Sequence, residues 1–150
     1  SAYVKKIYVS TDSIEIKEIA EKNNVLSFER PKDLLGEAEV ADIYVDLMKK
    51  IPNNGITHVI GLQPDHPDRQ NKLDEMINYF IEKKYMDLFT VNKNGSRNGS
   101  VRIFKAENVL TGQMSRRVGS ILDDCTNVEN KWQLDLASKR ILEGDYYEKN

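Results

Sequence analysis

The 150-residue chain contains one cysteine, four prolines and one tryptophan, and it has no long hydrophobic run. The single cysteine, Cys125, has no partner for an internal disulfide, which excludes a disulfide scaffold and fits a reducing compartment. The apolar stretches are only a few residues long, far below the ~20 residues that span a bilayer. We therefore expect a cytoplasmic protein with neither a membrane segment nor an N-terminal leader.

An excess of one charge sign is also missing, because 22 basic residues face 24 acidic ones and the formal net charge is -2. Nucleic-acid-binding domains normally carry a strong basic patch, which this balance does not indicate. The composition is instead that of a globular protein, with 39% hydrophobic and 31% charged residues. A chain of this length predicts a single domain over residues 1–150 with one core.

Several familiar catalytic patterns are absent as well. The sequence has no Ser-His-Asp arrangement, no paired-cysteine metal spacing and no glycine-rich phosphate loop. Cys125 has no neighbouring histidine and is expected to be inert. Trp132 is expected in the core beside Leu136 rather than as a stacking platform. The remaining candidates for chemistry are carboxylates, amides and arginines.

Short β-branched and aromatic runs alternate with segments of helical periodicity. The runs predict strands at 6–10, 25–28, 58–62, 88–91, 101–104 and 118–122. The periodic segments predict helices at 13–22, 38–51, 73–81, 106–110 and 132–142. Residues 92–99 hold Asn-Gly and Gly-Ser turn signals and predict a loop or a hairpin tip. Strands that alternate with helices imply parallel crossovers, so we expect an α/β three-layer sandwich with a mostly parallel sheet.

In such sheets ligands bind beyond the carboxyl ends of the strands. Three places meet this rule: Thr11-Asp12, the 63–67 loop and the segment after Leu122. The 63–69 loop (QPDHPDR) carries five polar side chains, and its two prolines reduce the entropy lost on binding a ligand. Gln63 and Asp65 are therefore functional candidates. Asp68 is expected to cap the following helix, and His66 fits either a hydrogen-bonded or a catalytic role.

Carboxylates accumulate in the last third of the chain, at positions 123, 124, 129 and 135. Mg²⁺ binds oxygen ligands, often one or two carboxylates completed by phosphate oxygens and water. Asp65 and one carboxylate of the 123–129 loop would suffice, if the fold brings the two strand ends together. The alternative is a solvated acidic surface. Arg30 and Arg69 are candidate contacts for an anion or a base, with surface ion pairs as the alternative.

Taken in order, these segments resemble the cytidylyltransferases that activate acidic sugars, the acylneuraminate cytidylyltransferase (CMP-sialic acid synthetase) family, with the CMP-KDO synthetases as relatives. The most specific match is Leu-Gln-Pro-Asp-His-Pro-Asp-Arg at 62–69, which resembles the Leu-Gln-Pro-Thr-Ser-Pro-Leu-Arg signature. The other matching segments are Val-Ser-Thr-Asp at 9–12, Phe-Glu-Arg-Pro at 28–31, Asn-Gly-Ser-Val-Arg-Ile-Phe at 98–104 and Asn-Val-Glu-Asn at 127–130. The resemblance covers nearly the whole chain.

The resemblance implies a Rossmann-like nucleotidyltransferase sheet and the transfer of CMP from CTP to an acidic sugar of the sialic-acid type, with release of pyrophosphate. It also implies Mg²⁺ as cofactor and a homodimer formed through an arm at 92–117. The resemblance assigns Arg30 and Asp12 to the nucleotide, with Arg30 on the cytosine. It assigns Gln63 and Arg69 to the sugar acid, and Asp65 and Glu129 to Mg²⁺. It assigns catalysis to Asp65 and Gln63.

The sequence departs from the family pattern at three points. Ala41 replaces a serine that assists cytosine binding, and Asn127 replaces the first acidic residue of the Asp-Ile-Asp-Thr segment. The chain also opens at what would be the family's third element, without the N-terminal strand and the triphosphate loop. Two alternatives therefore stay open: a non-catalytic degenerate or truncated relative that acts as a binding or oligomerisation module, and an enzyme that uses UTP or another base.

Overall fold

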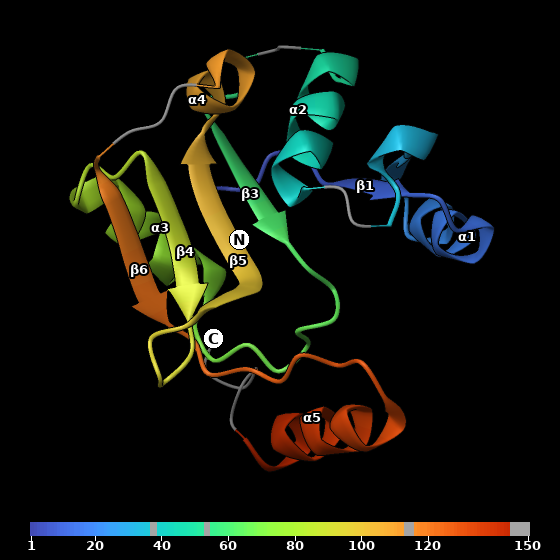
Figure 1. Cartoon of the computed structure of the whole chain (residues 1–150), viewed down its shortest axis with the longest axis vertical. Coiled ribbons are helices and arrows are strands. Elements are labelled where there is room, and N and C mark those ends of the chain that lie inside the picture. Colours follow the sequence, from blue (N-terminus) through green and yellow to red (C-terminus); the bar gives the residue numbers. More distant parts are fainter. Residues whose placement is uncertain (37–38, 53–54, 113–115, 145–150) are drawn as a thin grey trace. The chain divides into compact units, whose positions relative to one another are not determined.

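The computed structural model describes residues 1–36, 39–52, 55–112 and 116–144. The chain is of mixed α/β class and forms two compact units (Figure 1). The first comprises Ser1–Thr57 and Ala106–Gln113, and the second comprises His58–Lys105 and Met114–Asn150. The prediction of a single domain over residues 1–150 stays a prediction. No described helix is long and apolar enough to cross a membrane.

The first unit is built on a pair of parallel strands joined through a helix. Ser13 caps this helix by accepting a hydrogen bond from the Ile16 backbone N–H (3.3 Å), and Asn24, with φ of 57°, follows its end. Helix α4 packs against helix α2 in the same unit. The elements are β1 (Tyr8–Thr11), α1 (Ile14–Lys22), β2 (Leu26–Glu29), a 3₁₀ turn (Lys32–Leu34), α2 (Val40–Lys50) and α4 (Ala106–Thr111).

The second unit holds a four-stranded sheet in the order β3-β5-β4-β6. Strand β5 is antiparallel to both β3 and β4, whereas β4 and β6 are parallel. The three strands β3, β4 and β6 therefore run in one direction and β5 runs against them. The elements are β3 (His58–Leu62), α3 (Leu73–Glu82), β4 (Asp87–Val91), β5 (Arg97–Lys105), β6 (Val118–Leu122) and α5 (Lys131–Glu143).

The sheets are small and mixed, so the expectation of a mostly parallel sheet is not met. The reason is the short turn between β4 and β5, in which the Asn92 N–H donates to the Ser96 carbonyl (2.8 Å) and Gly95 adopts φ of 81°. So short a connection returns the chain antiparallel, since a parallel crossover needs a dozen or more residues. In the described chain β3 pairs with β5 alone, so it is an edge strand of this sheet.

The core of the second unit lies between α3 and the sheet. Met76, Ile77 and Phe80 on one face of α3 pack against Leu88 of β4 and the inner residues of β5. This packing leaves the carboxyl ends of β3, β4 and β6 together at one end of the sheet. Figure 1 shows the loop after β3 and the segment after β6 running beside each other there, next to α5. Residues 113–115, part of the expected dimer arm, lie outside the described residues.

Candidate functional site

The loop after β3 and the segment after β6 are joined by hydrogen bonds, one of them between main-chain atoms, although they lie far apart in the sequence. The Val128 N–H donates to the Asp65 carbonyl (2.8 Å), and the Gln70 N–H donates to Oδ1 of Asp123 (2.7 Å). The sequence expectation that these two segments meet at one end of the sheet is therefore confirmed. Gln63 and Asp65 come from the first segment and Glu129 from the second.

The buried side chain of Asp68 links the loop after β3 to the segment after β6. Its side chain is fully buried and accepts hydrogen bonds from the backbone N–H (2.7 Å) and hydroxyl (2.8 Å) of Thr126. Arg140 of α5 completes the cluster with an ion pair to Asp68 Oδ2 (2.9 Å). The prediction that Asp68 caps a helix is wrong, because α3 starts after Lys72 and the carboxylate is directed to the 126 position instead.

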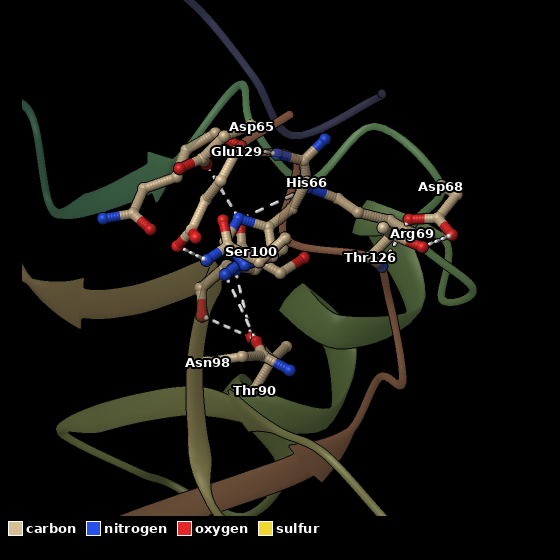
Figure 2. A network of polar contacts seen from close by, with 12 residues as sticks. Asp65, His66, Asp68, Arg69, Thr90, Asn98, Ser100, Thr126 and Glu129 are labelled. Carbon is tan, nitrogen blue, oxygen red and sulfur yellow. Dashed lines mark hydrogen bonds and ion pairs between the residues drawn. The ribbon is translucent and has the colours of Figure 1, made fainter. Parts of the chain in front are cut away.

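Asp65 and Glu129 lie on the same side of this polar network, as Figure 2 shows. The Asp65 carboxylate is half exposed, and its Oδ1 lies 2.8 Å from Nδ1 of the buried His66 ring. His66 therefore orients the carboxylate, which answers the question left by the sequence in favour of a hydrogen-bonded histidine. Glu129 is exposed, and its Oε1 accepts a hydrogen bond from the Asn127 side-chain amide (2.9 Å).

A polar cavity of about 250 Å³ opens beside Asp65. We call it the inner cavity; its lining includes Gln63, Asp65, His66, Arg97, Asn98 and Gly99. The guanidinium of Arg97 lies over the Phe89 ring, 4.0 Å from the ring centroid, which limits its orientations. Sequence reasoning missed Arg97, because the 92–99 segment carried only turn signals. Its position at the start of β5 is what brings a cation to the cavity.

Asn98 lines the inner cavity and is hydrogen-bonded to several of the segments around it. Its side-chain amide group donates to Oδ1 of Asn92 (2.9 Å) and to the Asp123 carbonyl (2.9 Å). Its carbonyl oxygen accepts hydrogen bonds from the Ser100 N–H (3.2 Å) and from the Thr90 hydroxyl. Thr90 lies where the register between β4 and β5 shifts, and its hydroxyl accepts from the Val101 N–H (3.1 Å). The asparagine therefore links both strands to the segment after β6.

Arg69, predicted to contact substrate, is used by the protein itself. Its Nε donates to the Ser100 carbonyl (3.2 Å), and its Nη2 donates to the Gln63 carbonyl. These bonds attach the 63–69 loop to β5. A role for Arg69 in substrate binding stays a prediction, whereas its structural role follows from the geometry.

Arg30 and Asp12 belong to the first unit, where each follows the end of a parallel strand. The Arg30 N–H donates to the Thr11 carbonyl (3.1 Å), and its Nη2 donates to the Ser10 carbonyl (2.8 Å). The Nε of Arg30 is buried and has no hydrogen-bond partner among the described residues. Asp12 is exposed. Their assignment to a nucleotide stays a prediction.

Two titratable groups with raised pKa values lie in the segment after β6. Burial raises the pKa of Asp123, whose side chain is fully enclosed and whose Oδ2 has no partner among the described residues. Burial also raises the pKa of the half-buried Cys125 thiol. A thiol with a raised pKa is a poor nucleophile, so the geometry favours the inert cysteine that the sequence predicts.

Asp65 and Glu129 are the residues that would hold Mg²⁺. No group of three or more His, Cys, Asp and Glu side chains gathers within the part of the chain that the structure covers. Asp65 and Glu129 offer two carboxylates on one side of the network. Mg²⁺ typically takes one or two carboxylates and completes its shell with substrate phosphates and water, so the pair fits this ion.

Comparison of the chain with protein-family models and with curated proteins found no match. The likeness to the acidic-sugar cytidylyltransferases therefore rests on the residues and motifs of the sequence.

Proposed function

We propose that the chain is a nucleotidyltransferase-type domain that transfers CMP from CTP to an acidic sugar of the sialic-acid type and releases pyrophosphate. The observation that carries the proposal is the hydrogen bond from the Val128 N–H to the Asp65 carbonyl (2.8 Å). It supports a shared metal role for Asp65 and Glu129, because the segments that carry these residues are joined at this point.

Asp65 and Glu129 would hold Mg²⁺ at the rim of the second unit. The ion supplies electrostatic stabilisation of the negative charge that develops on the phosphate oxygens. His66 keeps the Asp65 carboxylate in one orientation through the 2.8 Å contact between Nδ1 and Oδ1. The other half-exposed face of Asp65 remains accessible to a ligand.

The inner cavity suits the sugar acid. Arg97 offers a planar cation for the carboxylate of the sugar, and Gln63 offers an amide that can both donate and accept hydrogen bonds. The anomeric hydroxyl oxygen of the bound sugar would form a bond to the α-phosphorus of CTP, while the bond to the pyrophosphate oxygen breaks. The hydroxyl proton passes to solvent, which reaches the exposed face of Asp65.

The finer fold assignment and the nucleotide contacts are part of the same proposal. The parallel pairs β1·β2 and β4·β6, and the shared direction of β3, β4 and β6, support a Rossmann-like nucleotidyltransferase fold. The resemblance gives the cytosine to Arg30 and places Asp12 near the nucleotide. A homodimer remains part of the proposal on the resemblance alone.

One contact favours the alternative of a non-catalytic binding module. The Asn127 amide donates to Oε1 of Glu129 (2.9 Å), which occupies one of the oxygens that a metal would need. An aspartate at position 127 in place of Asn127 would not donate to Glu129 and would add a negative charge. A chain that keeps the scaffold but has lost its activity would tolerate this change.

Pyrophosphate release separates the two functions. The protein is incubated with CTP, Mg²⁺ and N-acetylneuraminic acid or KDO, and release should require all three components. Asp65→Ala should lower the rate by about 100-fold or more, since it removes a group that acts on the transition-state charge. Asp135→Asn is the matched control, because Asp135 is an exposed carboxylate on α5 that is paired with Lys131.

Each result decides between the candidates. Release that is unaffected by Asp65→Ala would overturn the assigned role of Asp65. A thermal shift with CTP and Mg²⁺ but no release of pyrophosphate would identify a binding module. The absence of both the thermal shift and pyrophosphate release would overturn the proposed function altogether. Competition among the four nucleoside triphosphates shows whether cytosine is the base that is recognised.

A further inference from the structure

A second cavity, of about 450 Å³, adjoins the inner cavity; we call it the outer cavity. Asn92, Cys125 and Asn127 line both cavities, so the two are neighbouring parts of one depression in the second unit. The outer cavity extends from the turn after β4 to the start of α5. A ligand held in the inner cavity can therefore reach the outer one without leaving the surface.

Trp132 forms a wall of the outer cavity, and 64% of its surface is exposed. The prediction that it lies in the core is wrong. Its position is fixed because α5 begins with a capping box, in which Asn130 accepts from the Gln133 N–H (3.2 Å) and the Gln133 side chain accepts from the Asn130 N–H (3.0 Å). Trp132 therefore presents a large, solvent-exposed aromatic ring on a well-capped helix, and a ligand can stack on this ring.

The groups around Trp132 are polar but carry little net charge. Asn94, Asn127 and Gln133 supply amides whose N–H groups can donate hydrogen bonds, whereas the oxygens of Asn94 and Gln133 already accept bonds within the protein. The charged pair at this wall, Lys93 with Asp124, is joined by an ion pair of 3.2 Å and is therefore largely neutralised. An aromatic face among amides suits an uncharged, polyhydroxylated chain or ring, whose C–H groups stack while its hydroxyls bond to the amides.

We propose that the outer cavity binds the hydroxylated, uncharged part of the sugar acid, with Trp132 stacking on it, while the acidic end lies in the inner cavity near Arg97. This inference rests on the proposed function for the identity of the ligand. It adds Trp132 as the residue that contacts the hydroxylated part of the acid, a part that the proposed function leaves without a protein contact.

The single tryptophan of the chain makes the inference directly measurable. Intrinsic tryptophan fluorescence reports only on Trp132, so ligand stacking should produce a saturable change in its intensity or wavelength. The titrants are N-acetylneuraminic acid, which has both parts; pyruvate, which has only the acid; and N-acetylmannosamine, which has only the hydroxylated part. Each titration is repeated with CTP and Mg²⁺ present. We expect the full sugar acid to give the strongest saturable signal and pyruvate to give none.

Variants show whether the signal comes from binding at this wall. In calorimetric titrations with N-acetylneuraminic acid, Trp132→Ala should weaken affinity by about tenfold, and Trp132→Phe should retain affinity within about threefold. Leu136→Ala is the matched control, because Leu136 lies one turn further along α5 and 40% of its surface is exposed. Since Trp132 is exposed, none of these changes should unfold the protein.

The outcomes distinguish this inference from the proposed function. Calorimetric binding of the sugar acid with no fluorescence change, and with unaltered affinity in Trp132→Ala, would overturn the inference and leave the proposed function standing. A stacking signal without pyrophosphate release would keep the outer cavity as a sugar site in a non-catalytic module. Failure of every sugar acid to bind, with and without CTP and Mg²⁺, would overturn the inference.

Discussion

The side-chain amide of Gln63 lies directly against the α-carbon of Gly99. A β-carbon at position 99 would overlap the amide oxygen of Gln63 and would lie 3.0 Å from its nitrogen. Because Gly99 of β5 has no side chain, the Gln63 side chain has the space that it occupies. Gly99 thus acts as a positioning residue for the inner cavity, although it carries no chemistry of its own.

Gly99→Ala should displace the Gln63 amide with little loss of stability, because the atoms that must move are the far end of a flexible side chain. If Gln63 holds the sugar acid, affinity for N-acetylneuraminic acid should fall by about tenfold. Gly119→Ala is the matched control, since its β-carbon would overlap the Tyr85 ring instead. It should lower the melting temperature and leave sugar affinity unchanged. Equal affinities in Gly99→Ala and the wild type would remove Gln63 from the sugar site.

Asp68→Ala should destabilise the second unit strongly, by about 3–5 kcal/mol, because it removes one partner of a buried ion pair and leaves Thr126 and Arg140 with unpaired polar groups. Urea unfolding measures the change. Thr126→Val, which removes the hydroxyl bonds to Asp68 and Arg140 but keeps the backbone N–H bond, should cost about 1–2 kcal/mol. Asp135→Ala breaks only an exposed pair with Lys131 and should cost well under 1 kcal/mol. Similar losses for all three variants would contradict the central role of Asp68.

Asp123→Asn should stabilise the protein in a pH-dependent way. Burial raises the pKa of Asp123, so its contribution to stability is complete below the pKa of about 3.9 of the unfolded chain and is lost as pH rises through the higher pKa of the folded state. At pH 7 the variant should be more stable than the wild type, because the amide keeps the bond from the Gln70 N–H without the buried charge.

Urea unfolding of the Asp123→Asn variant and the wild type, at several pH values between 4 and 8, gives this difference directly. The gain should shrink towards low pH, where the native carboxyl is already protonated. A gain that stays the same at every pH would rule out the buried charge as its cause.

Gln133→Ala should loosen the segment that carries Glu129. The Gln133 side-chain oxygen accepts from the N–H groups of Glu129 (2.8 Å) and Asn130 (3.0 Å), so its loss should cost about 1 kcal/mol of helix stability. Affinity for Mg²⁺ with CTP should fall several-fold, as measured by thermal shift. Gln133→Glu retains the capping box and should restore both quantities. Loss of Mg²⁺ affinity in both variants would point to the amide itself rather than to the cap.

Local structure was well predicted because its signals are local. The strand predictions at 58–62 and 118–122 coincide with β3 and β6, since β-branched residues fill both runs and breakers bound them. The hairpin tip allowed at 92–99 is confirmed by the antiparallel pairing of β4 with β5. Partner strands otherwise follow from contacts that periodicity does not encode, so the pairing of β5 with β3 was missed. Ile16 and Ile19 of α1 are both exposed although they are apolar, because a two-stranded sheet offers a small surface for a helix to cover.

The site was predictable only where a general rule of sheets applied. The rule that ligands bind beyond the carboxyl ends of strands indicated the loops that carry Asp65 and Glu129, and these two loops do lie together. The buried role of Asp68 depends on Thr126 and Arg140, whose distance in sequence leaves no local signal. Arg97 and Trp132 were missed for a related reason, since a turn signal and an apolar residue type say little about which cavity a side chain will line.

The bond that joins Val128 to Asp65 runs between main-chain atoms, so no side chain at either position is needed to maintain it. The loops can stay in register while the groups that project from them are replaced. The loops can therefore keep their course whichever side chains stand at positions 127 and 129. New specificities could therefore arise at this edge by single substitutions.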